Sequence, residues 1–187
     1  MDASTRRAIA EYVKPLAVGL DGVTNYGDIE RIVAASEEIG AGDTRLDGDL
    51  LFLLAVFSGQ EKWVSRMGHG SRTEIFLASL GVPARRVRAL FAGLGRFERD
   101  PATPEEEVVH DAVRLDGMGA YGIARHLVEG YMERLDFGEM ADAVETAARA
   151  PLCTEKGRAL AEGRRQAMLE FARQLRSEYG QFRKADS

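Results

Sequence analysis

The chain has 187 residues, 45% of them apolar, and a formal net charge of -5. This length suits a single domain with a full core, and the acidic balance argues against a general nucleic-acid binder, which needs a clustered basic surface. The only cysteine, Cys153, excludes an internal disulfide and a zinc site built from cysteines, so a reducing cytoplasm fits best.

The apolar segments do not indicate export or a membrane span. The N-terminal sequence MDASTRRAIAEYV lacks the apolar core of a signal peptide. The longest apolar run, Leu50 to Phe57, is far shorter than the ~20 residues that a membrane helix needs. We therefore expect a soluble, cytoplasmic protein with no membrane partner.

Helical spacing of apolar residues predicts helices in the first part of the chain. Ser4 is a suitable N-cap for a first helix that ends near Gly19. After a short polar turn, Asp28 opens a second helix that ends at Gly40. The carboxylate of Asp28 either caps this helix and complements its dipole or belongs to a functional site.

The next segments are less periodic. The continuous apolar run from Leu50 to Phe57 is compatible with a buried strand or a buried helix, and its helical neighbours favour a helix. Residues 59–68 are expected to be irregular or a short helix, with Trp63 as an anchor. His69 then begins an amphipathic helix that carries Ile75 among its apolar residues.

An arginine-rich helix follows Pro83, with Val87 and Leu90 facing inward. Its arginines are most simply a solvated face, and a phosphate-binding role is the alternative. These residues are Arg85, Arg86, Arg88 and Arg96.

Strong capping signals define the second half of the chain. Thr103, Pro104 and the glutamates after them predict the start of a helix that delivers Asp111. Further helices are predicted through Ile123, Leu127 and Tyr131, over 137–148, and after a Thr154 cap. No alternating strand pattern is visible in the sequence. We expect an all-α helical bundle that forms one domain over 1–180, with a disordered tail at 181–187.

Two segments carry a family resemblance. DAVRLDGMGAYGIAR, which begins at Asp111, and TEKGRALAEGRRQAMLEF, which begins at Thr154, resemble segments of the small bacterial HD-domain metal-dependent phosphohydrolases. The resemblance implies an HD-domain-like helical bundle in which Asp111 is the last metal ligand.

The other ligand positions of that family are altered in this chain. The helix with the pattern H-x-x-R-V falls on DIERI, so Asp28 stands at the position of a ligand histidine. The apolar segment LLFLLAVFSG matches the run into the eponymous His-Asp pair, whose positions hold Val56 and Phe57. His69 matches a histidine that supplies a ligand or a phosphate contact in dinuclear relatives, and a further family histidine, expected near Leu94 to Phe97, is absent.

These replacements imply a dismantled metal centre. Val56 and Phe57 offer no ligand atoms, and an apolar pair would fill and dry the site, so we expect no bound metal and no other cofactor. The His110-Asp111 dipeptide spells the eponymous pair, but it lies in the final-Asp motif. It also lacks the apolar lead-in and the downstream ligand that the true pair needs.

Without a cation, the remaining acidic groups suggest two interpretations. Asp28 and Asp111 would lie close together, and like charges in a dry pocket raise one pKa, so that with His69 they could form a metal-free acid/base site. Alternatively, Asp28 is a helix cap and Asp111 forms an ion pair with Arg114, Arg125 or another buried arginine.

The remaining candidates are predicted from the same positions. The residues expected to line a ligand pocket are Tyr26, Val56, Phe57, Trp63 and Arg114, although aromatic residues at these spacings also build cores. His110 and His126 are interpreted as surface histidines or as core histidines with satisfied hydrogen bonds.

Three functions follow from the resemblance and its gaps. The first is a non-hydrolytic pseudoenzyme that binds a small molecule or serves a partner as an accessory subunit. The second is a metal-independent enzyme of small-molecule metabolism, with lyase, cyclase or proton-transfer chemistry at Asp28 and Asp111. The third is a residual phosphohydrolase. The expected partners are a small molecule, a protein or a second copy of the chain, and not a nucleic acid.

Overall fold

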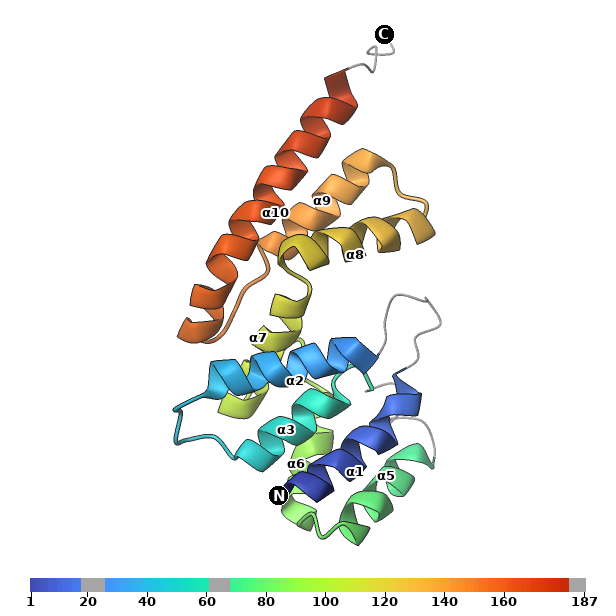
Figure 1. Ribbon diagram of the computed structural model, residues 1–187, viewed down its shortest axis with the longest axis vertical. Helices are drawn as coiled ribbons and strands as arrows, with labels where there is room; N and C mark the ends of the chain where they lie inside the picture. The colour runs from blue at the N-terminus through green and yellow to red at the C-terminus, as the bar shows by residue number, and fades with distance from the viewer. Residues whose placement is uncertain (18–25, 61–67, 182–187) are drawn as a thin grey trace. The chain divides into compact units, whose positions relative to one another are not determined.

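The computed structural model describes residues 1–17, 26–60 and 68–181, and all regular structure within these ranges is helical. The all-α prediction is therefore confirmed. The chain divides into two compact units, Met1–Val113 and Arg114–Ser187, whose helices are shown in Figure 1. The single domain over 1–180 stays a prediction. Trp63 and the tail from 182 onward lie outside the described residues, and no described helix is long and apolar enough to cross a membrane.

The first unit is built around the buried helix α3 (Gly48–Phe57). Its elements are α1 (Ala3–Val13), η1 (Lys14–Leu16), α2 (Tyr26–Gly40), α3 (Gly48–Phe57), α5 (His69–Ser79), α6 (Ala84–Leu94) and most of α7 (Pro104–Asp116). Every residue from Leu51 to Phe57 is buried, which explains why this run shows no helical period: a helix with neighbours all round is apolar all round. The helical interpretation of the run is thus confirmed.

Two helix starts differ from the sequence expectation. The N-cap of α1 is Asp2, whose Oδ1 accepts the Thr5 amide at 2.8 Å, and the predicted cap, Ser4, instead donates its hydroxyl to Asp2 at 3.0 Å. A carboxylate two positions earlier caps the helix and also complements its positive end. The second helix begins at Tyr26, so Asp28 lies inside its first turn and does not open it.

Two expectations for α5 and α6 are also wrong. Ile75 is 70% exposed, because Thr73 and Leu77, one turn apart, define the buried side of α5 and Ile75 lies between them on the opposite side. Arg86 and Arg96 are not simply solvated, because each meets acidic groups from other elements. Arg96 makes two hydrogen bonds to the buried Glu106, at 2.7 and 2.9 Å.

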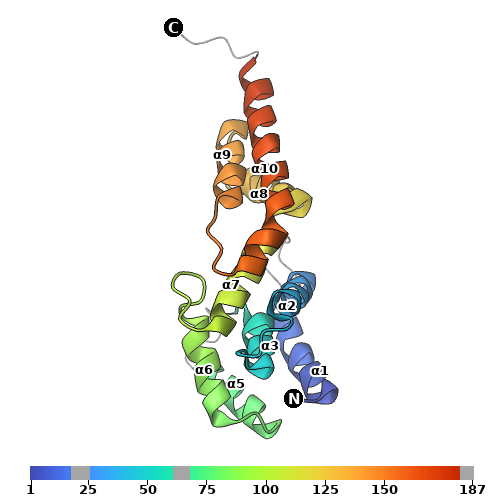
Figure 2. The same ribbon diagram turned by 90° about the vertical axis from the view of Figure 1, so that its left-hand side faces the viewer.

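The second unit packs three helices against one another, and both views show α9 and α10 side by side (Figures 1 and 2). They are α8 (Gly119–Met132), α9 (Phe137–Ala148) and α10 (Glu155–Gln181). The α9 bounds match the predicted 137–148 range. Thr154 accepts the Gly157 amide at 2.9 Å, as its predicted capping role requires.

Glycines shape the corner between α7 and α8. Gly119 has a φ of 77°, a left-handed conformation that glycine adopts without strain. A Cβ on Gly122 would lie 2.1 Å from the carbonyl oxygen of Gly117, so a side chain there would push the corner apart. The glycines of the DGMGAYG segment therefore serve the turn itself.

Candidate functional site

The α2–α3 hairpin brings three of the predicted site positions to one end. The helices pack against each other and run in opposite directions, joined by residues 41–47 (Figure 1). The first turn of α2, which carries Asp28, therefore lies at the same end of the hairpin as the last turn of α3, which carries Val56 and Phe57. This is the arrangement that the family resemblance requires of those positions.

Asp28 is buried and has a basic partner. Its side chain is only 4% exposed, and Oδ1 accepts a hydrogen bond from the Arg31 guanidinium one turn along α2. An ion pair at this spacing balances the charge of a carboxylate that would otherwise be costly to bury. In the match to the H-x-x-R-V pattern, Arg31 stands at the arginine and Asp28 stands at the histidine. The ion pair therefore joins a residue that agrees with the pattern to one that departs from it.

Val56 and Phe57 belong to the core. Their exposed fractions are 1% and 0%. The Phe57 ring lies 6.5 Å from the ring of Tyr12, which itself stacks on Phe76 with centroids 4.1 Å apart. The Tyr12 hydroxyl lies 3.2 Å from Oγ1 of the buried Thr73. Phe57 thus joins an aromatic cluster contributed by α1, α3 and α5.

These two residues do not fit a metal centre. Neither offers a donor atom, and both are packed in the core at the positions that the resemblance matches to two ligands, so a divalent cation there would be dehydrated without adequate compensation. Val56 and Phe57 therefore cannot contribute to metal-assisted hydrolysis.

Asp111 is fully buried on α7 and pairs with its neighbour in sequence. Its Oδ1 lies 3.1 Å from Nδ1 of His110, which is 6% exposed. A carboxylate at this distance can orient the imidazole ring. The His110-Asp111 dipeptide therefore forms a buried carboxylate–imidazole contact. His126 is half-buried, with Nδ1 3.4 Å from Glu129.

The other candidates are distributed over both units. His69 is the first residue of α5 and is half-buried. Tyr26 begins α2, its ring faces the ammonium of Lys14 at 5.7 Å, and burial together with nearby glutamates raises its pKa. Arg114 is exposed, and Arg125 lies 3.5 Å from Asp116. The roles assigned to these residues stay predictions.

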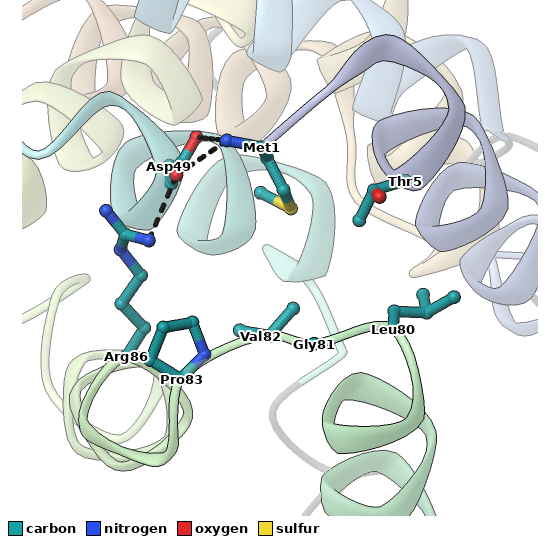
Figure 3. A pocket seen from close by; sticks show the side chains of 8 residues that line it. All are labelled: Met1, Thr5, Asp49, Leu80, Gly81, Val82, Pro83 and Arg86. Carbon is teal, nitrogen blue, oxygen red and sulfur yellow. Dashed lines mark hydrogen bonds and ion pairs between the residues drawn. The ribbon is translucent and has the colours of Figure 1, made fainter.

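A charged pocket in the first unit was not predicted. Figure 3 shows Asp49 between the Met1 amino group and Arg86, at 2.8 and 3.0 Å, above the turn that contains Val82. Arg86 also binds Asp47 at 2.8 Å. Burial raises the pKa of Asp47, but hydrogen bonds from Arg86 and from the first amides of α3 outweigh burial and lower it. This pocket of about 190 Å³ includes none of the predicted site residues.

No local signal in the sequence pointed to this cluster. Its charged groups come from Met1, the first turn of α3 and the first turn of α6, which are far apart in sequence. Taken singly, Asp47 and Asp49 are what the start of a helix favours, and Arg86 is what a polar helix face favours. Only the packing of the three helices joins them.

Comparisons with known proteins agree on the fold. No protein-family model matches the chain, and no curated protein matches it. A structure from Listeria innocua is 19% identical, with a TM-score of 0.78, over 98% of this chain and 100% of its own. Bacillus subtilis YpgQ in complex with ADP is 20% identical, with a TM-score of 0.71, over 94% and 95% of the two chains. An HD-superfamily hydrolase from Bacillus thuringiensis is 17% identical, with a TM-score of 0.71, over 95% of each chain.

These similarities show that the chain has the HD-domain-like helical fold. Sequence identities of 17% to 20% show a shared fold and nothing about a shared function. Hydrolase activity and ADP binding are properties given for those proteins, and the function of this chain has to be inferred from its own residues.

Proposed function

We propose that this chain is an HD-domain-like protein without metal-dependent hydrolysis, which acts as a small-molecule-binding protein or as the accessory subunit of a partner. The burial of Val56 and Phe57 at the positions of two family ligands carries the proposal. A cytoplasmic location and a role in small-molecule metabolism are part of it.

Exposed apolar residues support the accessory role. The last turns of α8 and the start of α9 expose Val128, Tyr131, Met132 and Phe137, by 44%, 79%, 51% and 53%. Apolar side chains gathered at one end of a helical unit are the kind of surface that a protein partner covers.

A phosphate-release assay tests the loss of hydrolysis. The purified protein, supplied in turn with manganese, magnesium, zinc and nickel salts, is expected to leave nucleoside phosphates and simple phosphoesters intact. The reason is that Val56 and Phe57, at two positions that the resemblance matches to ligands, have no donor atom for a metal that would activate water. Asp111→Asn is the matched control and should match the wild type. Turnover that the wild type shows and Asp111→Asn loses would establish hydrolysis and end the proposal.

A second function, metal-independent acid/base chemistry, is favoured by the His110–Asp111 contact. A buried carboxylate beside an imidazole is a common way to prepare a general base. In this alternative Asp111 orients His110 or shares protons with Asp28.

Substitution by asparagine separates the two functions, because it keeps the shape of each side chain and removes its charge and its acid proton. In cells that carry only Asp28→Asn or Asp111→Asn, we expect the same metabolite profile as with the wild type, provided that circular dichroism shows the variants folded. Accumulation of one metabolite at the expense of another, with partner binding retained, would favour the enzyme instead.

A further inference from the structure

The α2–α3 hairpin contains a cavity whose lining extends from the 41–47 connection along the two helices to Val33 and Ala55. It has a volume of about 200 Å³ and lies between the second half of α2, the 41–47 connection and the first part of α3. Val33, Leu46, Leu51 and Phe52 line it with apolar groups. Because none of the predicted site residues lines it, an inference about it stands whether or not the proposed function is correct.

A glycine lets the cavity close on one side. A Cβ on Gly40, the last residue of α2, would lie 2.9 Å from Cδ1 of Leu46 and 3.0 Å from Cδ2 of Leu51. The absence of a side chain at Gly40 therefore allows the connection to fold its leucine against the end of α2. The wall formed in this way is made of packed side chains rather than of an open loop.

One polar group in the lining lacks a partner. Ser36 is 1% exposed, lines the cavity, and its hydroxyl makes no hydrogen bond to any described residue. Buried hydroxyl groups are normally satisfied by protein or by water, so each exception needs an explanation. A ligand that offers one donor or acceptor at this depth would supply the missing bond.

The charges at the rim are already paired. Arg6 lies 2.9 Å from Glu37, and its guanidinium also covers the ring of Phe52 at 4.7 Å from the centroid. Asp43 lies 2.6 Å from Arg45. An anionic ligand would have to compete with Glu37 for Arg6, and a cationic ligand would have to compete with the arginines. The rim therefore favours an uncharged ligand.

We propose that this cavity binds an uncharged single-ring molecule that carries a hydroxyl group, with the ring on the Val33, Leu51 and Phe52 surface and the hydroxyl bonded to Ser36. The size is suitable, because an apolar cavity of roughly 150 Å³ holds benzene. Such a site is separate from the position where the HD-domain resemblance places the metal ligands.

Phenol and toluene are matched probes, since they share the ring and differ in the hydroxyl group. In a protein-detected NMR titration at low-millimolar concentrations, phenol should shift the amides around Ser36 and Leu51 and bind more tightly than toluene. Ser36→Ala should weaken phenol about fivefold, the equivalent of one net hydrogen bond of ~1 kcal/mol, and leave toluene unchanged. The variant should be no less stable than the wild type, because it removes an unsatisfied buried group.

A blocking variant with a matched control completes the test. Ala41→Trp places a large ring at the exposed mouth of the cavity and should abolish binding, whereas Ala34→Trp, on an exposed part of α2 outside the lining, should not. The absence of phenol shifts, shifts that map elsewhere, binding retained in Ala41→Trp, or an equal effect of Ser36→Ala on both probes would each overturn the proposal.

Discussion

Replacement of Phe57 by alanine is expected to lower the free energy of unfolding by about 3–5 kcal/mol. Phe57 has no exposed surface, and its ring neighbours Tyr12, which stacks on Phe76. Loss of the ring removes buried apolar area and leaves a cavity that the packed helices fill only in part. Chemical denaturation followed by circular dichroism measures the change.

Phe137→Ala is the matched control for this substitution. Phe137 is 53% exposed on α9, although its ring contacts Tyr179 with centroids 5.7 Å apart, so the change should cost about 1 kcal/mol or less. If Phe57→Ala cost no more than this control, Phe57 would not be a core residue. Core packing would then not explain why an apolar side chain stands at the position that the resemblance matches to a metal ligand.

Restoration of the family's ligands should have a second large effect. The triple variant Asp28→His, Val56→His, Phe57→Asp places two imidazoles and a carboxylate at buried positions. Without metal it should lose several kcal/mol of stability or unfold. Because the hairpin brings all three positions to one end, added manganese or zinc should raise its melting temperature, as expected for a ligand that binds only the folded state.

The wild type and the double variant Val56→Ala, Phe57→Ala are the controls for metal rescue. The wild type should show little change with metal, and the alanine variant should be destabilised without rescue. If the triple variant unfolds and no metal restores it, then Asp28, Val56 and Phe57 do not occupy the ligand positions, and the residue-level part of the resemblance would be wrong.

Local signals made most helices predictable. The starts of α7 and α10 follow from Thr103 and Thr154, because a capping residue and its first-turn partners are close in sequence. The helical structure of α3 is predictable from the helices on either side of it, because its continuous apolar run has no period that separates a helix from a strand. The cap of α1 was missed because Asp2 and Ser4 are both good caps and only the backbone decides between them.

The side-chain contacts of the site were less predictable. Neighbouring residues on a helix point about 100° apart, so the contact between His110 and Asp111 is not one that spacing suggests. Arg86 and Arg96 were assigned to a solvated face because their acidic partners belong to other helices. The sequence indicated that Val56 and Phe57 are apolar, whereas their place in an aromatic cluster with Tyr12 required the fold.

Elemental analysis of the purified wild type tests the central claim most directly. Asp111→Asn, analysed in parallel, shows whether any metal found depends on Asp111, which the resemblance matches to the family's last ligand. Because the resemblance matches Val56, Phe57 and Asp28 to three ligand positions, and the first two have no donor atom, both proteins should carry far less than one equivalent of transition metal. About one manganese, iron, zinc or nickel ion per wild-type chain, lost in Asp111→Asn, would show an intact metal centre and contradict the claim.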